Sequence, residues 1–441
     1  MLRERSGRVG PRFAVPALLT AIAYVDPGNF GVNLAAGASY GHALVWVVVA
    51  ASVTATLIQY LAAKLGAVSG VGLARDTADR VPPVLRLLAW AQAELVVLMT
   101  DLAELVGGAI ALNLLVGLPL PVGAVLVAAA SLAVLGLRRT GIGPLTVVVL
   151  TLLAVIVVAI AAQLVLLRLG APVVPAPAPI DRGAVLLAVG IVGATVMPHA
   201  LHFHSALSVS RPAVDPHPER PVDAGSEASA TGPSTTGPTT AGPSTTGAVS
   251  RRAGVPMRSH PVRPVRVALI VAAAMVLASA TNVALVYIGA DLPREAGADL
   301  ATAATAIGVS GGEAARVLFG IALLASGLAA TVVGGYTGQI VMDAFWRRPL
   351  PVWIRRLVGV VIPLGILIAG VDPTRALVIS QVVLSFCLPG TLVPLVVLTA
   401  RRSVMGRYVN RRTTTILAAG AAVAITAMDV VLLVLAAGGG V

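Results

Sequence analysis

The sequence has little charge and almost no cysteine. Only 11% of its 441 residues are Asp, Glu, Lys or Arg, whereas 57% are hydrophobic. So low a charged fraction, with apolar runs of about 20 residues that recur along the chain, excludes a soluble domain and is typical of a polytopic membrane protein. Cys387 is the only cysteine, so an internal disulfide is excluded, and we interpret this side chain as apolar packing inside a span.

Hydrolytic motifs are also missing or misplaced. No H-E-x-x-H motif is present, so a zinc-dependent membrane protease has no visible site. The sequence GASYG (37–41) fits G-x-S-x-G, but it falls at the outer end of a predicted span, and this pattern is catalytic only at a strand-to-helix turn. The first apolar run contains Asp26 and has no suitable cleavage site, so a cleavable signal is not indicated. We expect a protein that is not an enzyme and needs no cofactor.

The net charge of +12 does not indicate binding to nucleic acid, because the arginines collect in alternate short loops. If the N-terminus is cytoplasmic, the cytoplasmic loops contain pairs such as Arg138 and Arg139, while the outer loops contain acids such as Asp291 and Glu295. This positive-inside pattern predicts a multi-pass protein of the cytoplasmic membrane, with the lipid bilayer as its surroundings. About eleven spans are predicted: 14–37, 43–63, 84–115, 120–137, 144–168, 183–210, 264–290, 314–341, 352–371, 375–400 and 411–437.

One segment does not fit the bilayer. Residues 211–262 contain TGPSTTGPTTAGPSTTG, a Gly/Pro/Ser/Thr tract with nothing to bury. We interpret 211–262 as a disordered cytoplasmic insertion between spans six and seven, with a regulatory or docking loop as the alternative. On this interpretation, 1–210 holds the cytoplasmic N-terminus, the first five spans and span six. Residues 263–400 hold spans seven to ten, and 401–441 hold a cytoplasmic loop and the last span.

Two spans are interrupted by proline beside polar residues. They read AIAYVDPGNFGVN (21–33) in span one and GIVGATVMPHALHFHSAL (190–207) in span six. An aspartate at the bilayer centre costs about 2.5–3.5 kcal/mol, and proline and glycine interrupt the helix. Spans one and six open two successive sets of five. Such a pair in corresponding positions points to an inverted-repeat transporter with a binding site near the midplane. The alternative is two proline-kinked helices without a site.

The residue types at the two interruptions favour one class of cation. Asp26 and Asn29 offer hard oxygen donors, whereas Met197 offers a soft thioether. Mg²⁺ and Ca²⁺ prefer shells made only of oxygen, and sulfur suits later metals. The mixed set therefore favours a first-row transition ion such as Mn²⁺ or Fe²⁺.

These residues carry a resemblance to the Nramp family of proton-coupled divalent metal transporters. The resemblance covers nearly the whole chain apart from the first dozen residues and 211–262. It implies an all-α membrane protein with a LeuT-type fold: two inverted five-helix repeats plus one C-terminal helix, with helices 1 and 6 broken at mid-membrane. The segments that carry it are DPGN (26–29), QYLAAKLGAVSG (59–70), TDLAELVGGAIAL (100–112), ATVMPH (194–199), GGYTGQIVMDAF (334–345) and DPTRALVISQVVLSF (372–386).

The resemblance also implies a set of metal ligands that joins both interruptions to span ten. Gln381 would add its ligand only in some conformations. The implied ligands are two side-chain oxygens, a backbone carbonyl, a thioether and an amide: Asp26, Asn29, Ala194, Met197 and Gln381. This sequence departs from the family at Ala200 and His202, where Asn and an aromatic residue are expected; both departures bear on proton handling and leave the ligands intact.

Span three carries three acids that the resemblance assigns to proton transfer. Asp101 and Glu104 are three residues apart and therefore nearly share a helix face, and Glu94 lies earlier in the same span. The alternative is a structural polar seam. Arg355 and Arg356 match the family's basic partners for these acids, although the sequence alone allows them to be anchors of a cytoplasmic loop.

Three histidines fall within six residues of span six. His199, His202 and His204 could suggest a metal site, since imidazole is a common ligand. The resemblance assigns His199 and His204 to the polar passage, and we interpret them as proton relays or passage lining. It assigns no role to His202.

The predicted function is proton-coupled import of Mn²⁺, and also of Fe²⁺, across the cytoplasmic membrane by alternating access. Divalent metal ions and protons would be the co-substrates, and the chain would act as a monomer without a nucleic-acid partner. The alternative is a LeuT-fold secondary transporter of an amino acid or another small solute, which would not need Met197 at the interruption.

Overall fold

The computed structural model describes residues 10–137, 142–169, 179–209, 264–346 and 352–437. The chain divides into two units, 1–209 with 262–441 and, separately, 210–261, and all of the described residues belong to the first. All of the predicted insertion, 211–262, lies outside the described residues, as do residues 1–9 of the N-terminus. The division of the chain into four parts stays a prediction.

The described residues form helices and contain no strand. The N-terminal helices are α1 (Gly10–Ala21), η1 (Ile22–Tyr24), α2 (Pro27–Tyr40), α3 (Val45–Ser69), α4 (Leu73–Ala78), α5 (Pro83–Val116), α6 (Leu120–Gly136) and α7 (Ile142–Leu169). The remaining helices are α8 (Arg182–Thr195), α9 (Pro198–Leu207), α10 (Pro264–Ala290), η3 (Arg294–Gly297), α11 (Leu300–Phe345), α12 (Val352–Ile368), α13 (Pro373–Ala400), α14 (Arg402–Met405), η4 (Gly406–Tyr408) and α15 (Arg412–Ala437).

Within the described part of the chain, eight helical segments are long and apolar enough to cross a membrane. One of these is α8 continued by α9. Three shorter apolar helices, Phe13–Tyr24, Leu120–Gly136 and Leu357–Ile368, fall in the three remaining predicted spans. Each of the eleven predicted spans thus has a helical counterpart, and the multi-pass architecture is confirmed.

Span eight differs from the prediction, because α11 begins at Leu300 rather than near residue 314. Its first residue is preceded by Asp299, whose side chain accepts a hydrogen bond of 2.7 Å from the Thr302 amide and so caps the helix. The helix then kinks at Gly312, where φ is +81°, a conformation that glycine adopts without strain. The segment before the kink is rich in small residues and therefore lacks a strong apolar signal.

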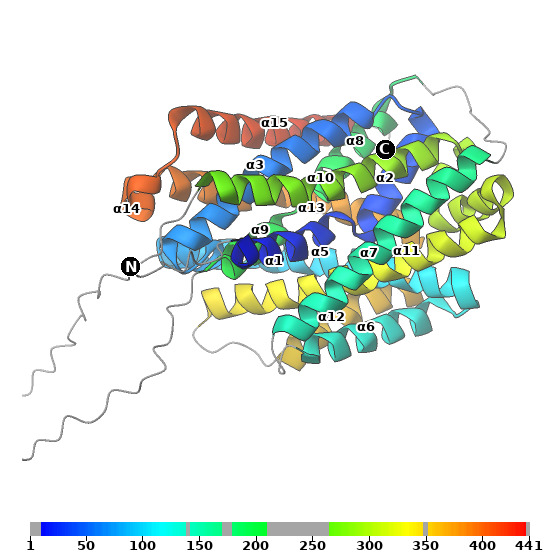
Figure 1. The fold of residues 1–441 in the computed structure, drawn as a ribbon, viewed down its shortest axis with the longest axis horizontal. Helices are drawn as coiled ribbons and strands as arrows, with labels where there is room; N and C mark the ends of the chain where they lie inside the picture. Colours follow the sequence, from blue (N-terminus) through cyan, green and yellow to red (C-terminus); the bar gives the residue numbers. More distant parts are fainter. Residues whose placement is uncertain (1–9, 138–141, 170–178, 210–263, 347–351, 438–441) are drawn as a thin grey trace, which may run out of the picture. The chain divides into compact units, whose positions relative to one another are not determined.

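Small residues allow the central helices to pack closely. Helix α11 packs on α5 and α7, while α10 packs on α2 and α3 (Figure 1). A Cβ built on Gly327 of α11 would lie 3.1 Å from Cα of Gly108 of α5, and one built on Gly289 of α10 would lie 2.4 Å from the Leu34 carbonyl oxygen of α2. Close approach at small residues is how helices associate in membranes, where lipid supplies no hydrophobic driving force between them.

Several ionisable side chains are buried inside this helical unit, and many large apolar side chains lie on its surface. Asp26, Asp101 and Glu104 are each at most 1% exposed, whereas large apolar side chains such as Trp46 and Ile416 are well exposed. Buried acids and so many exposed apolar side chains are unusual in a soluble protein, and the apolar surface suits contact with lipid. This arrangement places the ionisable residues where a transport pathway can use them.

Candidate metal site at the two broken helices

The first break separates η1 from α2 at Val25 and Asp26. Val25 leaves the helical conformation, with φ −130° and ψ 55°, and Asp26 is extended. The Asp26 carboxylate accepts a hydrogen bond of 2.9 Å from the backbone N–H of Asn29 and so caps α2, while Pro27 takes the first helical position. An acidic cap followed by proline is a strong helix start, so the local sequence DPGN restarts the helix directly after the break.

The carbonyls that the first break frees are bound by side chains of two other helices. Asn282 of α10 donates to the Tyr24 carbonyl at 2.8 Å, and Ser326 of α11 donates to the Val25 carbonyl at 2.6 Å. Unwound backbone in a membrane is tolerated only where such partners satisfy it. The first break is therefore fastened to the surrounding helices.

The second break separates α8 from α9 at Val196 and Met197. Val196 has φ −102° and ψ 74°, and Met197 is extended and precedes Pro198, the first residue of α9. Met197 occupies the position that Asp26 occupies in the first break, but its thioether makes no capping hydrogen bond to α9. The two breaks therefore share a backbone design and differ in the side chain at the cap.

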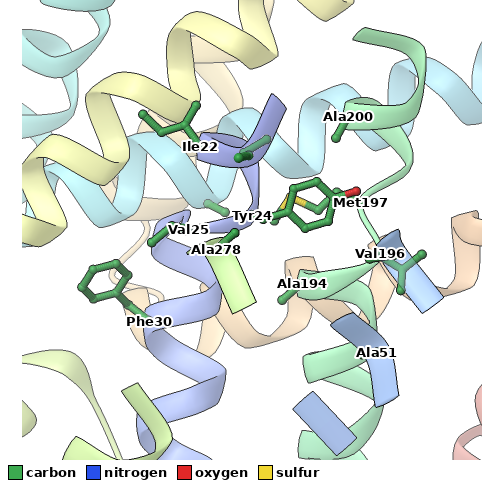
Figure 2. Packing of buried hydrophobic residues seen from close by; sticks show 14 of the residues in the cluster. Ile22, Tyr24, Val25, Phe30, Ala51, Ala194, Val196, Met197, Ala200 and Ala278 are labelled. Carbon is green, nitrogen blue, oxygen red and sulfur yellow. The ribbon is translucent and has the colours of Figure 1, made fainter. Parts of the chain in front are cut away.

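The two breaks meet through Asn29. Its side-chain amide nitrogen donates to Asp26 Oδ1 at 2.8 Å and to the carbonyl of Ala194, 165 residues away in the chain, at 3.0 Å. Figure 2 shows residues of both breaks in one buried cluster, with Tyr24 and Val25 from the first and Ala194, Val196 and Met197 from the second. The structure thus brings Asp26, Asn29 and Ala194 together, as a shared site requires.

Several buried oxygens at this point have no hydrogen-bond partner among the described residues. Buried polar atoms without a partner are rare in native proteins and call for an explanation. Oxygens with free lone pairs are also what a divalent cation binds. The buried oxygens without a partner are Asp26 Oδ2, Asn29 Oδ1, Gln381 Oε1 and Thr195 Oγ1. Thr195 is a candidate that the sequence analysis missed; its only sequence signal is a hydroxyl directly beside Ala194.

Gln381 of α13 lies against both breaks. A Cβ built on Gly28 would lie 2.0 Å from Gln381 Nε2, and one built on Gly193 would lie 2.0 Å from the Gln381 carbonyl oxygen. Both contacts exist only because glycine has no Cβ. The side chain is fully buried, and its Nε2 donates to Ser380 Oγ at 3.2 Å, which leaves the amide oxygen unpaired.

The donor set contains a single carboxylate. Among the described residues, no three His, Cys, Asp or Glu side chains converge on one point, so a conventional cluster of charged ligands is absent there. The buried groups instead combine one carboxylate, amide and carbonyl oxygens, and the thioether of Met197. Oxygens with one sulfur suit a borderline cation better than a hard one, and the set therefore fits a transition ion.

The predicted proton-transfer residues line a polar seam between α5, α11 and α12. Glu94 lies 3.6 Å from Arg355, and the two side chains are 16% and 8% exposed. The side chain of Arg356 lies outside the described residues. Like Glu94, both Asp101 and Glu104 belong to α5, and the spacing of seven and ten residues from Glu94 keeps all three near one face.

Glycines of the facing helices make room for the charged groups of this seam. A Cβ on Gly359 would lie 2.4 Å from Asp101 Oδ2, and a Cβ on Gly334 would lie 2.9 Å from Glu104 Oε2. One turn beyond Glu104, a Cβ on Gly107 would lie 2.1 Å from Cβ of Pro27, the residue after Asp26. The first break therefore lies against α5 one turn from Glu104, and the glycines that shape the seam were not singled out by the sequence analysis.

Two histidines of α9 are held by hydrogen bonds to other helices. Nδ1 of His199 lies 3.1 Å from the Thr100 hydroxyl of α5, and Nδ1 of His204 lies 2.7 Å from Gln59 Oε1 of α3. Gln59 in turn donates to the Tyr24 hydroxyl at 2.5 Å, so His204 is linked to the first break. His202 lies between them in the sequence, is 5% exposed, and has no partner among the described residues at either ring nitrogen.

Comparison with known sequences gives one family. The model of the family described as natural resistance-associated macrophage protein-like matches residues 17–435. A divalent metal cation transporter, MntH, of Deinococcus radiodurans is 38% identical over 439 residues, which are 96% of this chain and 91% of the relative. A protein of the same name from Mycobacterium tuberculosis is 39% identical over 432 residues, covering 95% of this chain and 90% of its own.

Comparison with solved structures supports the fold. The manganese transporter of Eremococcus coleocola, solved with an aromatic bis-isothiourea compound, has a TM-score of 0.71 at 25% identity, over 95% of this chain and 85% of its own. Mhp1, a nucleobase-cation-symport-1 family transporter, has a TM-score of 0.56 at 16% identity, over 96% and 91% of the two chains. The LeuT-type fold expected from the sequence is thereby confirmed.

Proposed function

This chain belongs to the Nramp family of membrane transporters, and from that premise we propose that it carries divalent transition-metal ions across the cytoplasmic membrane, with Mn²⁺ as a substrate and Fe²⁺ as a second. Membership makes it a multi-pass membrane transporter and not an enzyme. Two lines support the choice of metal: the names of its relatives, and a buried donor set of oxygens with one thioether.

The observation that carries the proposal is the bridge made by Asn29. Its NH₂ group stands between the Asp26 carboxylate and the Ala194 carbonyl, where it gives both oxygens the positive partner that a cation would give. An arriving ion would take over these two oxygens, and rotation of the Asn29 amide would then present its own oxygen. We propose that Asp26, Asn29, Ala194 and Met197 bind the ion, and that Gln381 joins them as α13 moves.

Proton coupling forms part of the proposal. A single carboxylate, Asp26, would bind either a proton or the metal, so metal entry would release a proton. The contact of Pro27 with Gly107 brings the first break to α5, where Glu104, Asp101 and Glu94 continue the polar seam. We propose that protons leave along these acids, that His199 and His204 belong to the same polar passage, and that Arg355 and Arg356 balance the charge.

The direction and the unit of transport are proposed as well. With the N-terminus in the cytoplasm, inward movement of a divalent ion follows the inside-negative potential, worth about 2.3 kcal/mol per charge per 100 mV. The chain would act as a monomer, because both breaks and the seam lie within one chain. A LeuT-fold carrier of an amino acid or another small solute is the alternative, and Met197 at the second break argues against it.

Uptake into liposomes tests the proposal. The purified chain, reconstituted into proteoliposomes with an imposed pH gradient, should accumulate Mn²⁺ and acidify the lumen as it does so. Asp26→Asn serves as the matched control, since it removes the charge and retains an acceptor for the α2 cap. Accumulation of an amino acid without Mn²⁺ uptake would establish the alternative, and Mn²⁺ uptake without proton movement would remove the coupling.

A further inference from the structure

His202 is a buried imidazole that neither the fold nor the proposed transport cycle uses. It lies in the middle of α9 at 5% exposure, and neither ring nitrogen has a hydrogen-bond partner among the described residues. Burying a polar group without a partner costs free energy, so such a group calls for a reason. Its neighbours His199 and His204 both have partners from other helices, which makes His202 the exception on this helix.

The hydrogen bonds around His199 determine which of its nitrogens carries the proton. Thr100 donates its single hydroxyl hydrogen to the Val96 carbonyl at 2.9 Å. The same hydroxyl can therefore only accept from Nδ1 of His199, 3.1 Å away. The proton of the neutral imidazole is thus on Nδ1, and Nε2 carries the lone pair. A histidine whose Nδ1–H is held in this way is oriented as metal-binding histidines are, with Nε2 available as a ligand.

His199 and His202 lie on one face of α9. The two residues are three apart, which brings their side chains onto the same side of the helix. His204 is five residues from His199 and turns instead to Gln59 of α3. His199 follows Met197 by two residues, so this face begins directly beyond the second break.

We propose that His199 and His202 form a second metal contact, made of two imidazole nitrogens, one helical turn beyond the oxygen and thioether site. The proposal rests on the proposed function, since it assigns the contact to ions that pass through the second break. Imidazole ligands suit the later first-row ions, and divalent affinity rises from Mn²⁺ through Co²⁺ and remains above Mn²⁺ for Zn²⁺. The pair therefore holds Co²⁺ and Zn²⁺ and releases Mn²⁺ readily.

The test is equilibrium binding of Co²⁺ to the full-length, tag-free chain in detergent. His217 and His260 lie outside the described residues and are replaced by Gln in every sample, so that the remaining imidazoles are the four in described helices and loops. All samples also carry Asp26→Ala, which removes the only carboxylate of the first site. We expect one Co²⁺ to bind per chain, with a cobalt X-ray absorption spectrum that contains imidazole scattering.

Two variants of His202 and one matched control decide the outcome. His202→Phe and His202→Gln should each remove the bound Co²⁺, by at least tenfold in affinity, whereas His42→Gln should retain it. His42 is a suitable control because it stacks on Tyr287, with ring centroids 4.6 Å apart, far along the chain from α9. An unchanged elution volume and melting temperature show that each variant folds, and the Gln variant keeps a polar side chain if Phe does not fit.

The possible results separate this proposal from the proposed function. The second contact would be overturned if Co²⁺ still bound in both His202 variants, or if it were already lost in the Asp26→Ala background. Mn²⁺ uptake by the chain without these substitutions would then still support the proposed function. Binding that depends on His202 in a chain that takes up no Mn²⁺ would support the contact and count against the proposed function. His202 would be plain packing if the Phe variant bound Co²⁺ as its parent does.

Discussion

The two breaks differ in which groups bind their freed carbonyls and cap the helix that follows. In the first, side chains of α10 and α11 bind the freed carbonyls of Tyr24 and Val25, and a carboxylate caps the helix that follows. In the second, no side chain caps α9, and the Ala194 carbonyl takes its hydrogen bond from Asn29 of the first break. The first break is thus fastened to the surrounding helices, while the second depends on the first. Changes at the first break should therefore have the larger effects.

The largest effect is expected at Asp26. Asp26→Ala should abolish Mn²⁺ uptake and also lower the stability by about 1 kcal/mol, because it removes both the charge and the α2 cap. Asp26→Asn should abolish uptake with a smaller loss of stability, since the amide oxygen can still cap the helix. Asn29→Ala should likewise abolish uptake, because it removes the side-chain bridge from Asp26 to the Ala194 carbonyl. Uptake assays and thermal melting of the three variants measure these differences.

Near wild-type uptake in Asp26→Ala or in Asn29→Ala would refute the assignment of the site to the breaks. If the Ala variants lose uptake only because they are unfolded, Asp26→Asn still tests whether the Asp26 carboxylate binds the metal. Its retained cap separates the loss of a ligand from the loss of the helix start.

A second, smaller effect is expected along the seam that begins at the first break. Asp101→Asn and Glu104→Gln should reduce proton flux by about tenfold, ~1.4 kcal/mol in barrier terms, while leaving equilibrium Mn²⁺ binding nearly unchanged. Both acids lie on α5 beside glycines of α11 and α12, away from the donors of the breaks. Lumenal pH and metal binding are measured on the same preparation. Asp343→Asn, an exposed acid of α11, is the control.

The relay is wrong if these two substitutions abolish metal binding and leave proton flux intact. In that case Asp101 and Glu104 would support the metal site, and the proton would leave by another route.

The sequence predicts the breaks well because their signals are local. Proline directly after Asp26 and directly after Met197 indicates the start of a new helix. The matching helices occur where the apolar runs lie. The contact of Asn29 with Ala194 joins residues 165 positions apart, so no local pattern contains it, and it was expected only through the family resemblance.

The parts that escaped prediction depend on which helix faces meet. Gly334 and Gly359 matter because Glu104 and Asp101 lie against them, which becomes visible only once α5, α11 and α12 are packed. The start of α11 at Leu300 was missed because small residues give a weak apolar signal, and the cap at Asp299 was not recognised. The unpaired nitrogens of His202 are likewise a property of packing.

A selective effect is expected at the second break. Met197→Ala should retain measurable Mn²⁺ uptake, since the oxygens of Asp26, Asn29 and Ala194 remain. Cd²⁺ uptake should fall about tenfold further than Mn²⁺ uptake, ~1.4 kcal/mol, because the softer ion loses its sulfur ligand. Ca²⁺ and Mg²⁺ should compete better, since a water oxygen can replace the thioether. Parallel uptake of Mn²⁺ and Cd²⁺, with Ca²⁺ or Mg²⁺ as competitor, measures this.

Met275→Ala is the matched control, because Met275 is a buried methionine of α10 that belongs to neither break. It should leave the ratio of Cd²⁺ to Mn²⁺ uptake unchanged. If Met197→Ala also leaves that ratio unchanged and still rejects Ca²⁺ and Mg²⁺, Met197 is packing and the choice of metal has another cause.

The smallest effect is expected where α2 of the first broken helix meets α8 of the second. Tyr40, the last residue of α2, donates its hydroxyl to Asp181 at 2.5 Å, and Asp181 caps α8 by accepting from the Ala184 amide at 3.1 Å. These hydrogen bonds, that of Tyr40 first, lower the pKa of Asp181 below its ordinary value of 3.8. A carboxyl with a lowered pKa stabilises the folded protein fully above the unfolded pKa and loses that contribution as the pH falls through the folded pKa.

Tyr40→Phe should therefore lower the melting temperature slightly at pH 7, and the difference from wild type should shrink below about pH 4. Tyr408→Phe, whose hydroxyl accepts from Arg407 rather than joining the broken helices, should show no such convergence. A Tyr40→Phe difference that stays constant from pH 7 to pH 3 would mean that this contact does not depend on the Asp181 charge, and the two broken helices would then be coupled electrostatically at the breaks alone.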